Sequence, residues 1–377
     1  MGRPKRPTMS DVAARVGVSQ ALVSLVFRNQ PGASPDTRRR VFQAAEELGY
    51  RPDTAAQLLR RTRSRQLGVL FTMRQPHDVG IVEALYPAAR KHGYTLVLNA
   101  MVDTRDERQA MDELLGLRCE AIITIGTTFE RRHPVAHVGG PSIVEINPLT
   151  RAAGTDVVRT AERNGIRQAV DHLVAQGHRA IAHIDGGAMP AAEERRRGYR
   201  AAMRRHGLAD HIQIHPGDYT EESGARAARD LLARAELPTA VIAGNDRCAH
   251  GLLGTFLRAG VRVPEDVSIV GYDDSQLARL SFIDLTSVRQ DAAEAAERAV
   301  RAAVERLDEG RTADRDIVLN PTLVVREAPA RPAPRQRPTA TFSGDHWLSS
   351  GAPSSSWISR TAARPARLAP TVLAEGP

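Results

Sequence analysis

The chain has 377 residues, enough for about two or three domains of ordinary size, and its formal net charge is +8. The charge is unevenly placed, because residues 1–65 hold 13 Lys/Arg against 5 Asp/Glu and residues 66–327 hold 33 against 37. A basic head on a mildly acidic body excludes an evenly basic surface and indicates a nucleic-acid-binding domain joined to a domain of another kind.

The two cysteines, Cys119 and Cys248, are too few and too isolated for a disulfide framework or a zinc site. We expect both thiols to be buried structural groups. No run of about eighteen apolar residues occurs, and the N-terminal residues lack the apolar core of a secretory signal. We therefore expect a cytoplasmic protein that makes no membrane contact.

Residues 9–27 are predicted to form two short helices joined by a tight turn. Val12 and Val16 lie on one apolar face, and Gly17 suits the positive φ that ends a helix. Ser19 is placed to cap the second helix. The buried face of that helix would consist of Leu22, Val23 and Val26. A helix-turn-helix presents the outward residues of its second helix to base edges in the major groove. The alternative is an αα-hairpin without such a role.

A third helix is predicted to begin at Pro35, with Ser34 as its cap, and to end at Gly49. Its apolar stripe would close a small core against the first two helices. On its early turns, three arginines are candidate phosphate contacts, and a solvated charged face is the alternative. These are Arg38, Arg39 and Arg40.

Residues 54–61 have good helix propensity but are too few to form a stable helix alone in water. Because arginines flank this segment, it is suited to fold upon DNA, with Leu58 and Leu59 as apolar wedges in the minor groove. The alternative is a flexible basic linker.

Predicted strands and helices alternate from residue 66 to residue 327. Gln66–Thr72 is a near-continuous apolar run, as expected of a buried parallel strand. Further strands are predicted at 95–100, 121–125, 142–146, 180–185, 212–215, 240–243, 267–272, 317–319 and 323–325. Helices are predicted at 79–92, 105–117, 161–176, 191–206, 221–235, 246–259 and 292–307. We expect an α/β body of two doubly wound parallel-sheet subdomains, with the crossover following the strand at 142–146.

Polar residues follow several predicted strands, where ligands of doubly wound sheets bind. They are Arg195, Asp218, Tyr219, Asn245, Asp246, Asp273 and Asp274. Amide, carboxylate, guanidinium and aromatic groups together suit a sugar, because they bind vicinal hydroxyls and stack on the ring. Helix capping or turn chemistry is the alternative for each residue alone, and the shared placement favours the binding site.

The chain resembles the lactose-repressor/galactose-repressor (LacI/GalR) family of transcription regulators. In the head the matching segments are SDVAARVGVS (10–19), the Val23-Ser24 pair, Pro35 to Arg38, and LGYRPDTAAQLL (48–59). In the body they are GHRAIAHIDG (177–186), Arg195 to Tyr199, GNDRCAHG (244–251), VPEDVSIVGYDD (263–274) and LTSVRQD (285–291). The resemblance implies a periplasmic-binding-protein-like body that follows a helix-turn-helix head and a hinge helix.

The resemblance implies that Gln20, Ala21 and Leu25 read the major groove and that Leu59 is the minor-groove wedge. The candidate DNA contacts as a set are Ser19, Gln20, Ala21, Ser24, Leu25, Arg28, Ala56, Gln57 and Leu59. Leu25 departs from the family, which usually has arginine there. Since leucine cannot form a bidentate bond to guanine, we expect an apolar contact, for instance with a thymine methyl. Asp53, where asparagine is usual, is a second departure.

The resemblance also implies effector contacts in the body. They are Arg195, Tyr219, Asn245 and Asp273, with Arg247 and Gln290 as additions. A cation at Arg247 would favour an acidic or phosphorylated ligand. The loop at 73–80 is also expected to face the ligand, with no role assigned to any residue in it.

No nucleophile elbow, zinc-protease, P-loop or dinucleotide motif occurs, and the histidines lack metal-ligand spacing. We therefore expect no enzyme activity, no metal and no cofactor. A solute-binding protein and a sugar-processing enzyme with an added DNA-binding head are the alternatives. The missing signal peptide counts against the first, and the missing acid/base or nucleophile set counts against the second.

The predicted organisation is a DNA-binding head at 1–52, a hinge at 53–65, an effector-binding and dimerisation body at 66–327, and a disordered tail at 328–377. We expect a homodimeric repressor that grips a pseudo-palindromic operator. A small-molecule effector, a sugar or sugar derivative, would bind between the subdomains and change their orientation, which is coupled to the hinge helices.

Overall fold

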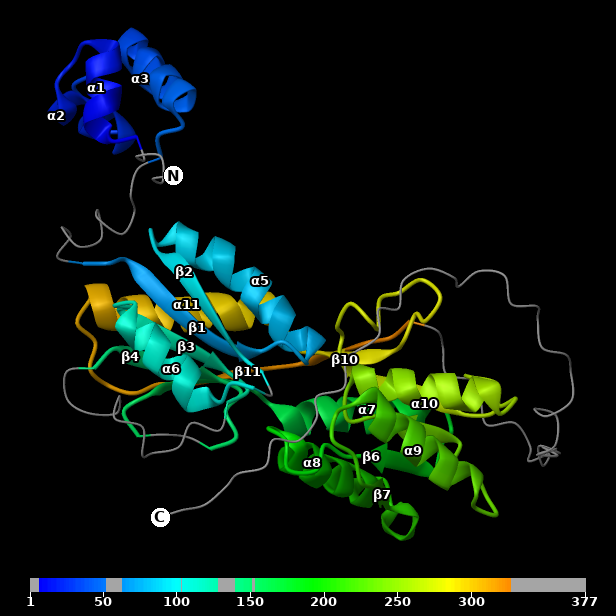
Figure 1. Cartoon of the computed structure of the whole chain (residues 1–377). Helices are drawn as coiled ribbons and strands as arrows, with labels where there is room; N and C mark the ends of the chain where they lie inside the picture. The colour runs from blue at the N-terminus through cyan, green and yellow to red at the C-terminus, as the bar shows by residue number, and fades with distance from the viewer. Residues whose placement is uncertain (1–6, 52–62, 103, 128–139, 151–152, 327–377) are drawn as a thin grey trace, which may run out of the picture. The chain divides into compact units, whose positions relative to one another are not determined.

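The computed structural model describes residues 7–51, 63–102, 104–127, 140–150 and 153–326 (Figure 1). The predicted hinge helix, with Ala56, Gln57 and Leu59, lies outside the described residues, and so does the predicted tail at 328–377. Within the described residues no single helix is long and apolar enough to cross a membrane, and α1 with α2 passes that test only as a pair bent by 108°.

The head consists of three helices around a small apolar core. They are α1 (Met9–Val16), α2 (Gln20–Phe27) and α3 (Pro35–Leu48). The predicted turn and caps are present: Gly17 has a φ of 74°, Leu22 N donates to Ser19 Oγ at 3.2 Å, and Thr37 N donates to Ser34 Oγ at 3.1 Å. The core consists of Val12, Ala13, Val16, Val23, Val26, Val41, Ala44 and Ala45. The helix-turn-helix prediction is confirmed.

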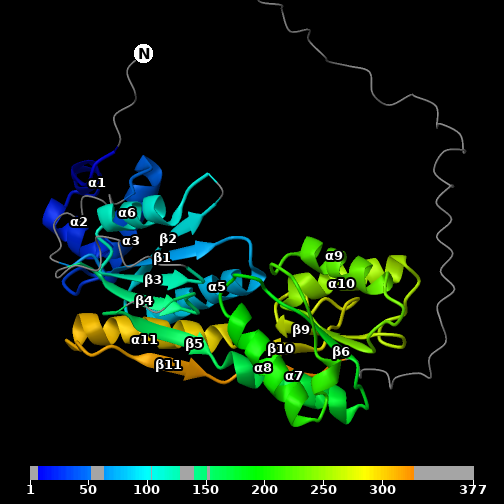
Figure 2. The same cartoon turned by 90° about the horizontal axis from the view of Figure 1, so that it is seen from below.

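The first subdomain of the body is built on a six-stranded parallel sheet of order β11-β5-β4-β3-β1-β2 (Figure 2). Its strands are β1 (Gln66–Thr72), β2 (Thr95–Met101), β3 (Ala121–Ile125), β4 (Ser142–Ile146), β5 (Asp156–Thr160) and β11 (Asp316–Leu319). Its helices are α5 (Pro76–Lys91), α6 (Glu107–Gly116) and α11 (Ala292–Asp308). Side chains alternate along β1, so that Val69 packs with α5 and α11 and Leu70 packs with α6 on the opposite face.

The second subdomain is built on a six-stranded sheet of order β12-β10-β9-β8-β6-β7, in which β12 alone runs antiparallel, to β10. Its strands are β6 (Ile181–Ile184), β7 (Gln213–His215), β8 (Ala240–Ile242), β9 (Ser268–Asp273), β10 (Ser287–Arg289) and β12 (Thr322–Val324). Its helices are α7 (Glu162–Ala175), α8 (Ala192–Arg205), α9 (Glu221–Leu232) and α10 (Asp246–Arg258), with a 3₁₀ turn at Ala209–His211. One core packs α7 and α8 on one face, and another packs α9 and α10 on the other face.

The chain passes between the two subdomains three times, from β5 to α7, from β10 to α11 and from β11 to β12. The predicted crossover follows the strand at 142–146, but only after β5, which was not predicted, has joined the first sheet. Sequence patterning missed β5 and β10 because each apolar run is interrupted by an arginine, Arg159 in β5 and Arg289 in β10. The two last strands were predicted, and each joins a different sheet.

Candidate DNA-binding head and effector cleft

The predicted DNA-reading residues lie at the start and along one side of α2. Gln20, Ala21 and Arg28 are exposed, whereas Ser24 and Leu25 are half-buried. The Leu25 side chain leans on the following turn, since a Cβ built at Gly32 would lie 3.2 Å from Leu25 Cδ1. Leu25 therefore contributes to the shape of the head as well as to its outer face.

Two of the three candidate phosphate-binding arginines also hold the head together. Arg40 Nη2 donates to the Val16 carbonyl at 2.8 Å, and so satisfies the end of α1. Arg38 Nη1 donates to Asn29 Oδ1 at 3.3 Å, in the turn after α2. Among the described residues Arg39 pairs only with its exposed neighbour Asp36, at 3.0 Å. Of the three arginines, Arg39 thus makes the fewest contacts within the head.

Five of the six predicted effector residues gather in one buried cluster between the subdomains: Arg195, Tyr219, Asn245, Asp273 and Gln290. Arg195 is its centre. Nε donates to Glu162 Oε2 at 2.8 Å, Nη1 donates to the Gly244 carbonyl at 2.6 Å, and Nη2 lies 3.9 Å from Asp273 Oδ1. The guanidinium carbon stands 3.7 Å from the centre of the Tyr272 ring.

Hydrogen bonds of this cluster link the two subdomains. Gln290 Nε2 donates to Asp273 Oδ1 at 2.7 Å, and Gln290 Oε1 accepts from Thr160 Oγ1 of β5 at 2.7 Å. Asn245 Nδ2 donates to Gln75 Oε1, just before α5, at 3.1 Å. Because Thr160 and Gln75 belong to the first subdomain, a ligand that displaces these bonds necessarily changes the contact between the subdomains.

Backbone strain and close packing occur at the same place. Asp273 and Tyr219 have φ angles of 108° and 64°, which L residues seldom adopt. The Tyr219 ring packs directly on Gly186, where any Cβ would lie 2.2 Å from a ring carbon. The strand ends are therefore shaped to hold the aromatic face and the carboxylate in fixed positions.

Burial changes the proton affinity of several side chains around the cluster. Burial, together with the charge of the nearby Asp273, raises the pKa of Asp78, in the first turn of α5, to about 8. It also raises the pKa of both Asp246 and Asp273. Burial and the positive charge of Arg195 lower the pKa of His77 to about 4.

The other strand-end residues serve local structure. Asp246 accepts from Ser275 N and Ser287 Oγ. Asp274 binds three guanidinium groups, and Asp218 is exposed beside Thr220. The sixth predicted effector residue, Arg247, lies outside the cluster: its guanidinium is paired with Glu221 and Nη1 donates to the Arg74 carbonyl at 2.7 Å. The capping and turn alternative therefore fits Asp218, Asp246 and Asp274, and Arg247 serves an ion pair.

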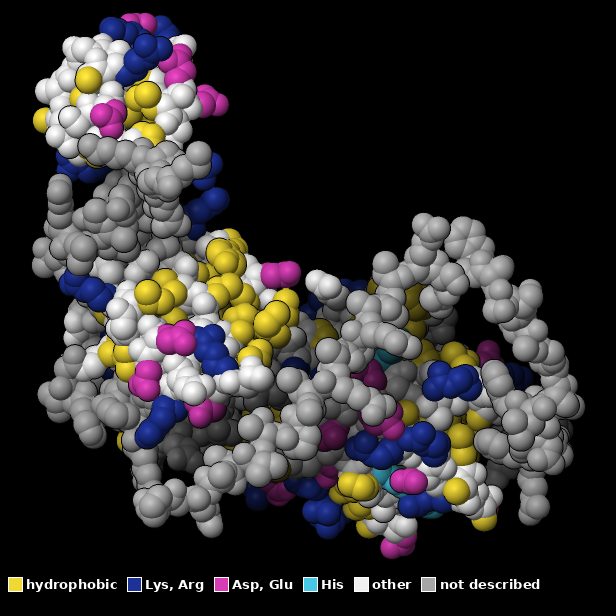
Figure 3. All heavy atoms as spheres, viewed as in Figure 1, with side chains coloured by type: hydrophobic (Ala, Val, Ile, Leu, Met, Phe, Trp, Pro, Cys, Tyr) yellow, Lys and Arg dark blue, Asp and Glu magenta, His cyan; other side chains and the backbone are white. Residues whose placement is uncertain are grey.

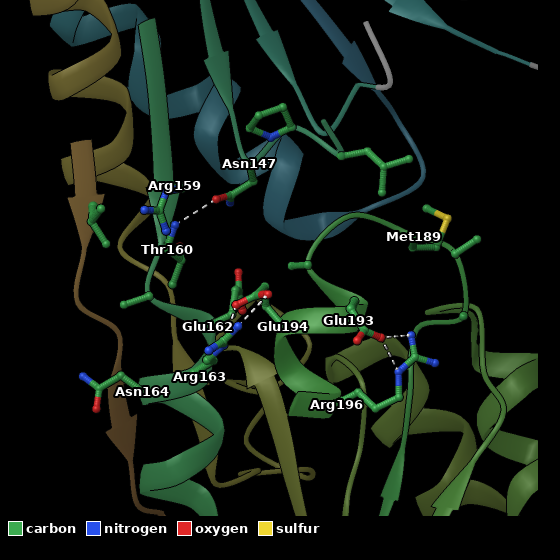
Figure 4. Close-up of a pocket in the computed structure, with 17 residues that line it drawn as sticks. Asn147, Arg159, Thr160, Glu162, Arg163, Asn164, Met189, Glu193, Glu194 and Arg196 are labelled. Atoms are coloured by element: carbon green, nitrogen blue, oxygen red, sulfur yellow. Dashed lines mark hydrogen bonds and ion pairs between the residues drawn. The ribbon is translucent and has the colours of Figure 1, made fainter. Parts of the chain in front are cut away.

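Two cavities flank the cluster. One of about 840 Å³ lies between the ends of β4 and β5 and the start of α8, and Figure 4 shows Asn147, Thr160 and Glu162 along it. The other, of about 580 Å³, includes His77 and Gln290 in its wall. Sequence reasoning named neither Asn147 nor Glu162. The strand-end rule would have found Asn147 directly after β4, and Glu162 only once β5 was recognised.

Comparison with known proteins agrees with this architecture. The family model described as bacterial regulatory proteins of the lacI family matches residues 8–53, and the periplasmic binding protein-like domain matches residues 170–328. The transcriptional regulator AscG of Escherichia coli K12 is 33% identical over 311 residues, which cover 80% of this chain and 93% of AscG. The chain belongs to the lacI family. It is a DNA-binding transcriptional regulator with a two-sheet ligand-binding-type body.

Solved structures of lacI-family proteins are similar along most of the chain. A LacI regulator from a Rhodococcus species has a TM-score of 0.68 and 41% identity, covering 71% of this chain and 98% of its own. The CelR–cellobiose complex has a TM-score of 0.62 and 31% identity, and the lac repressor dimer bound to operator and the anti-inducer ONPF has 0.72 and 26%. Both cover 86% of this lacI-family regulator and 100% of their own chains.

Proposed function

We propose that this regulator is a repressor whose affinity for a pseudo-palindromic operator is set by a sugar or sugar derivative bound between its subdomains. The observation that supports this most is the set of hydrogen bonds from Gln290 and Asn245, which join the two subdomains through polar groups suited to a sugar. A ligand bound in this cluster favours one relative orientation of the subdomains, and so shifts the regulator between its conformations.

The proposed DNA contacts are the outward residues of the head and the hinge. They are Ser19, Gln20, Ala21, Ser24, Leu25 and Arg28 in the head, and Ala56, Gln57 and Leu59 in the hinge. The operator complex of the lac repressor dimer supports this assignment. The division into a head at 1–52, a hinge at 53–65 and a body at 66–327 belongs to the same proposal.

The proposed effector contacts are the buried cluster. Arg195, Asn245, Asp273 and Gln290 would bind hydroxyls, and Tyr219 would present its ring. The bound cellobiose of CelR supports a sugar of some kind. Arg247, named from the sequence as a phosphate-favouring cation, is neutralised by Glu221, and this weakens the argument for a phosphorylated ligand.

A homodimer is part of the proposal, since two heads are needed to read two half-sites. Exposed apolar side chains support it: Tyr86 of α5, Leu98 of β2 and Val102 lie on the first subdomain, where Figure 3 shows apolar side chains gathered over α5 and β2. Phe282 of the second subdomain is 76% exposed. We also infer that the protein acts in the cytoplasm, where its DNA is, and that it is not an enzyme.

Selection of operators from random DNA tests this function. The full chain is expected to enrich a pseudo-palindromic site and to lose or gain affinity for it when one sugar of a panel is added. Enrichment of no sequence would contradict DNA recognition. An operator affinity that no sugar or sugar derivative alters would contradict the effector role.

A further inference from the structure

Two arginines, Arg63 and Arg65, lie just before β1, at the end of the segment predicted as the hinge. Both are tied to the first subdomain by their side chains. Arg63 Nε donates to Glu120 Oε2 at 3.0 Å, and Arg63 Nη1 pairs with Asp308 Oδ1 at 2.5 Å. Arg65 Nη1 pairs with the other oxygen of Asp308 at 2.8 Å. The linker from the head is therefore held on the body before the first strand begins.

The partners of these arginines come from three separate elements. Tyr94 directly precedes β2, Glu120 directly precedes β3, and Asp308 is the last residue of α11. Tyr94 OH accepts from Arg63 Nη2 at 2.7 Å and donates to Asp308 Oδ1 at 3.1 Å. Because β1, β2 and β3 are parallel, these groups meet at the amino edge of the sheet. We call Arg63, Arg65, Tyr94, Glu120 and Asp308 the linker clamp.

The linker clamp is better shielded from water than an ordinary surface ion pair. Tyr94 is buried, and the side chains of Glu120 and Asp308 are 13% and 27% exposed. Burial raises the pKa of both carboxyl groups, but hydrogen bonds from Arg63 and Arg65 outweigh burial and lower both pKa values. Isolated exposed pairs hold a geometry poorly, whereas a network of several charges holds it well.

The backbone of Arg65 is fixed as well as its side chain. Its φ of 55° is one that L residues seldom adopt, and such a conformation persists only where the surroundings determine it. Arg65 N donates to Glu120 Oε1 at 2.8 Å, and the Arg65 carbonyl accepts from Thr95 N at 3.0 Å. The guanidinium carbon lies 5.0 Å from the centre of the Tyr94 ring. The body thus sets the direction in which the chain enters β1.

The point at which the linker is held decides how far a head can reach. Residues 52–62 lie between the described part of the head and the linker clamp. Release of the clamp would lengthen this free linker by residues 63–65, which is about 10 Å of extended chain. That length corresponds to about three base pairs of DNA at about 3.4 Å each. In a dimer both linkers would gain it.

We infer that the linker clamp determines the half-site spacing that this regulator accepts, because it fixes the two points from which the heads of a dimer reach the DNA. The inference rests on the proposed homodimer and its pseudo-palindromic operator, whose half-sites are read at a separation set by the protein. Glu120 and Asp308 are positioning residues. As carboxylates they repel phosphate, and they act on DNA recognition through Arg63 and Arg65.

The experiment measures binding of the full-length protein to the operator selected from random DNA, at one fixed salt concentration. The same operator with one or two base pairs inserted at or removed from its centre is measured beside it. Wild type is expected to bind the selected spacing at least roughly tenfold more tightly than any altered spacing.

Glu120→Gln combined with Asp308→Asn removes the charges that the two arginines pair with and keeps the size of both side chains. This double variant is expected to reduce the spacing preference to within about threefold, since the linker is released. Arginines freed in this way can bind phosphate, but that raises affinity for every spacing alike and leaves the ratio unchanged.

The matched control is Glu297→Gln combined with Asp316→Asn. It removes two carboxylates of the same subdomain that pair with Lys91 and Arg159, and it is expected to keep the full spacing preference. Melting curves show whether each variant folds. If the clamp variant does not, Arg63→Gln combined with Arg65→Gln breaks the same ion pairs from the linker side and is expected to give the same loss.

The inference is overturned if wild type binds all spacings equally, if the clamp variant keeps the full preference, or if the control loses it to the same extent. In these cases operator recognition itself stands. Failure of wild type to enrich any pseudo-palindromic site would instead contradict the proposed function, and the inference with it.

Discussion

At the scale of single residues, the half-buried carboxyl group of Asp78 leads to a prediction about stability that needs no ligand. Its pKa is raised from its usual 3.8 to about 8 in the folded protein. A carboxyl group with a raised folded pKa stabilises the fold least when it is ionised, so stability falls as pH rises from about 4 to about 8. Asp78→Asn should match wild type near pH 4 and melt at a higher temperature near pH 8.

The matched control for this measurement is Asp218→Asn, because Asp218 is an exposed carboxylate outside the cluster. Hydrogen bonds from Thr220 and Ser223 outweigh the opposing effect of burial and lower the pKa of Asp218, so that its ionised form stabilises the fold. The control should therefore be no more stable than wild type near pH 8. An Asp78→Asn melting temperature that tracks wild type at every pH would show that this carboxyl group is solvated.

Single site residues could be predicted from the sequence where one local rule applied, and they were missed where two distant segments had to meet. Arg195, Asn245 and Asp273 were found because each lies at or beyond the carboxyl end of a strand, and parallel strands end at one edge. Their partners Gln75 and Thr160 come from the other subdomain. No local pattern reveals contacts across 130 and 170 residues of chain, because they depend on how two separately folded sheets meet.

At the scale of elements, α11 is held at its C-terminal end by the buried carboxylate of Asp156. The carboxylate accepts hydrogen bonds from Arg306 of α11 and from Arg311, at distances of 2.6 to 3.0 Å, and from the backbone N–H of Arg315 at 2.8 Å. Burial raises its pKa, but these partners outweigh burial and lower it to about 2. This anchor joins α11 to β5 and to the segment that leads into β11.

Asp156→Ala is expected to destabilise the body by about 3 kcal/mol, since it removes the buried carboxylate that Arg306 and Arg311 share and leaves them their weaker contacts with Asp314 and Glu305. Because the folded pKa is lowered, the stabilisation is present above about pH 4 and is lost as pH falls toward 2. The control is Glu297→Ala, which also lies on α11 and removes the exposed ion-pair partner of Lys91. It should lower the free energy of unfolding by less than about 1 kcal/mol. Equal urea midpoints for the two variants would contradict the anchor.

Helices and apolar strands were predicted to within a few residues, including short strands such as β8 and β12, whereas β5 and β10, which each include an arginine, were missed. The helix predicted at 79–92 begins at Pro76, because proline is acceptable in the first turn and extends the helix backwards. β10 has only three residues, Ser287–Arg289, and is a strand because β9 and β12 flank it. Tertiary pairing, which a sequence pattern does not contain, decides such elements.

At the scale of the whole molecule, the head and the cleft should be separable by mutation. Leu59→Ala removes the proposed minor-groove wedge and should weaken operator binding at least tenfold, in line with about 1–3 kcal/mol for a lost contact in the interface. Effector affinity, measured by titration without DNA, should not change. An operator affinity equal to that of wild type would contradict the wedge.

The converse variant changes a residue of the proposed effector cluster instead of the DNA-binding part of the chain. Asp273→Asn is preferable to alanine there, because the φ of 108° is strained and asparagine keeps a partner for Gln290. The variant should bind operator as wild type does, while the effector that shifts wild-type affinity has no effect at the same concentration. Three chain crossings join the subdomains, so a ligand that alters their contact can reorient the first subdomain, where residues 63–65 lead from the hinge into β1. Loss of operator binding without effector would instead mean that Asp273 stabilises the DNA-binding state itself, and an unaltered effector response would remove it from the site.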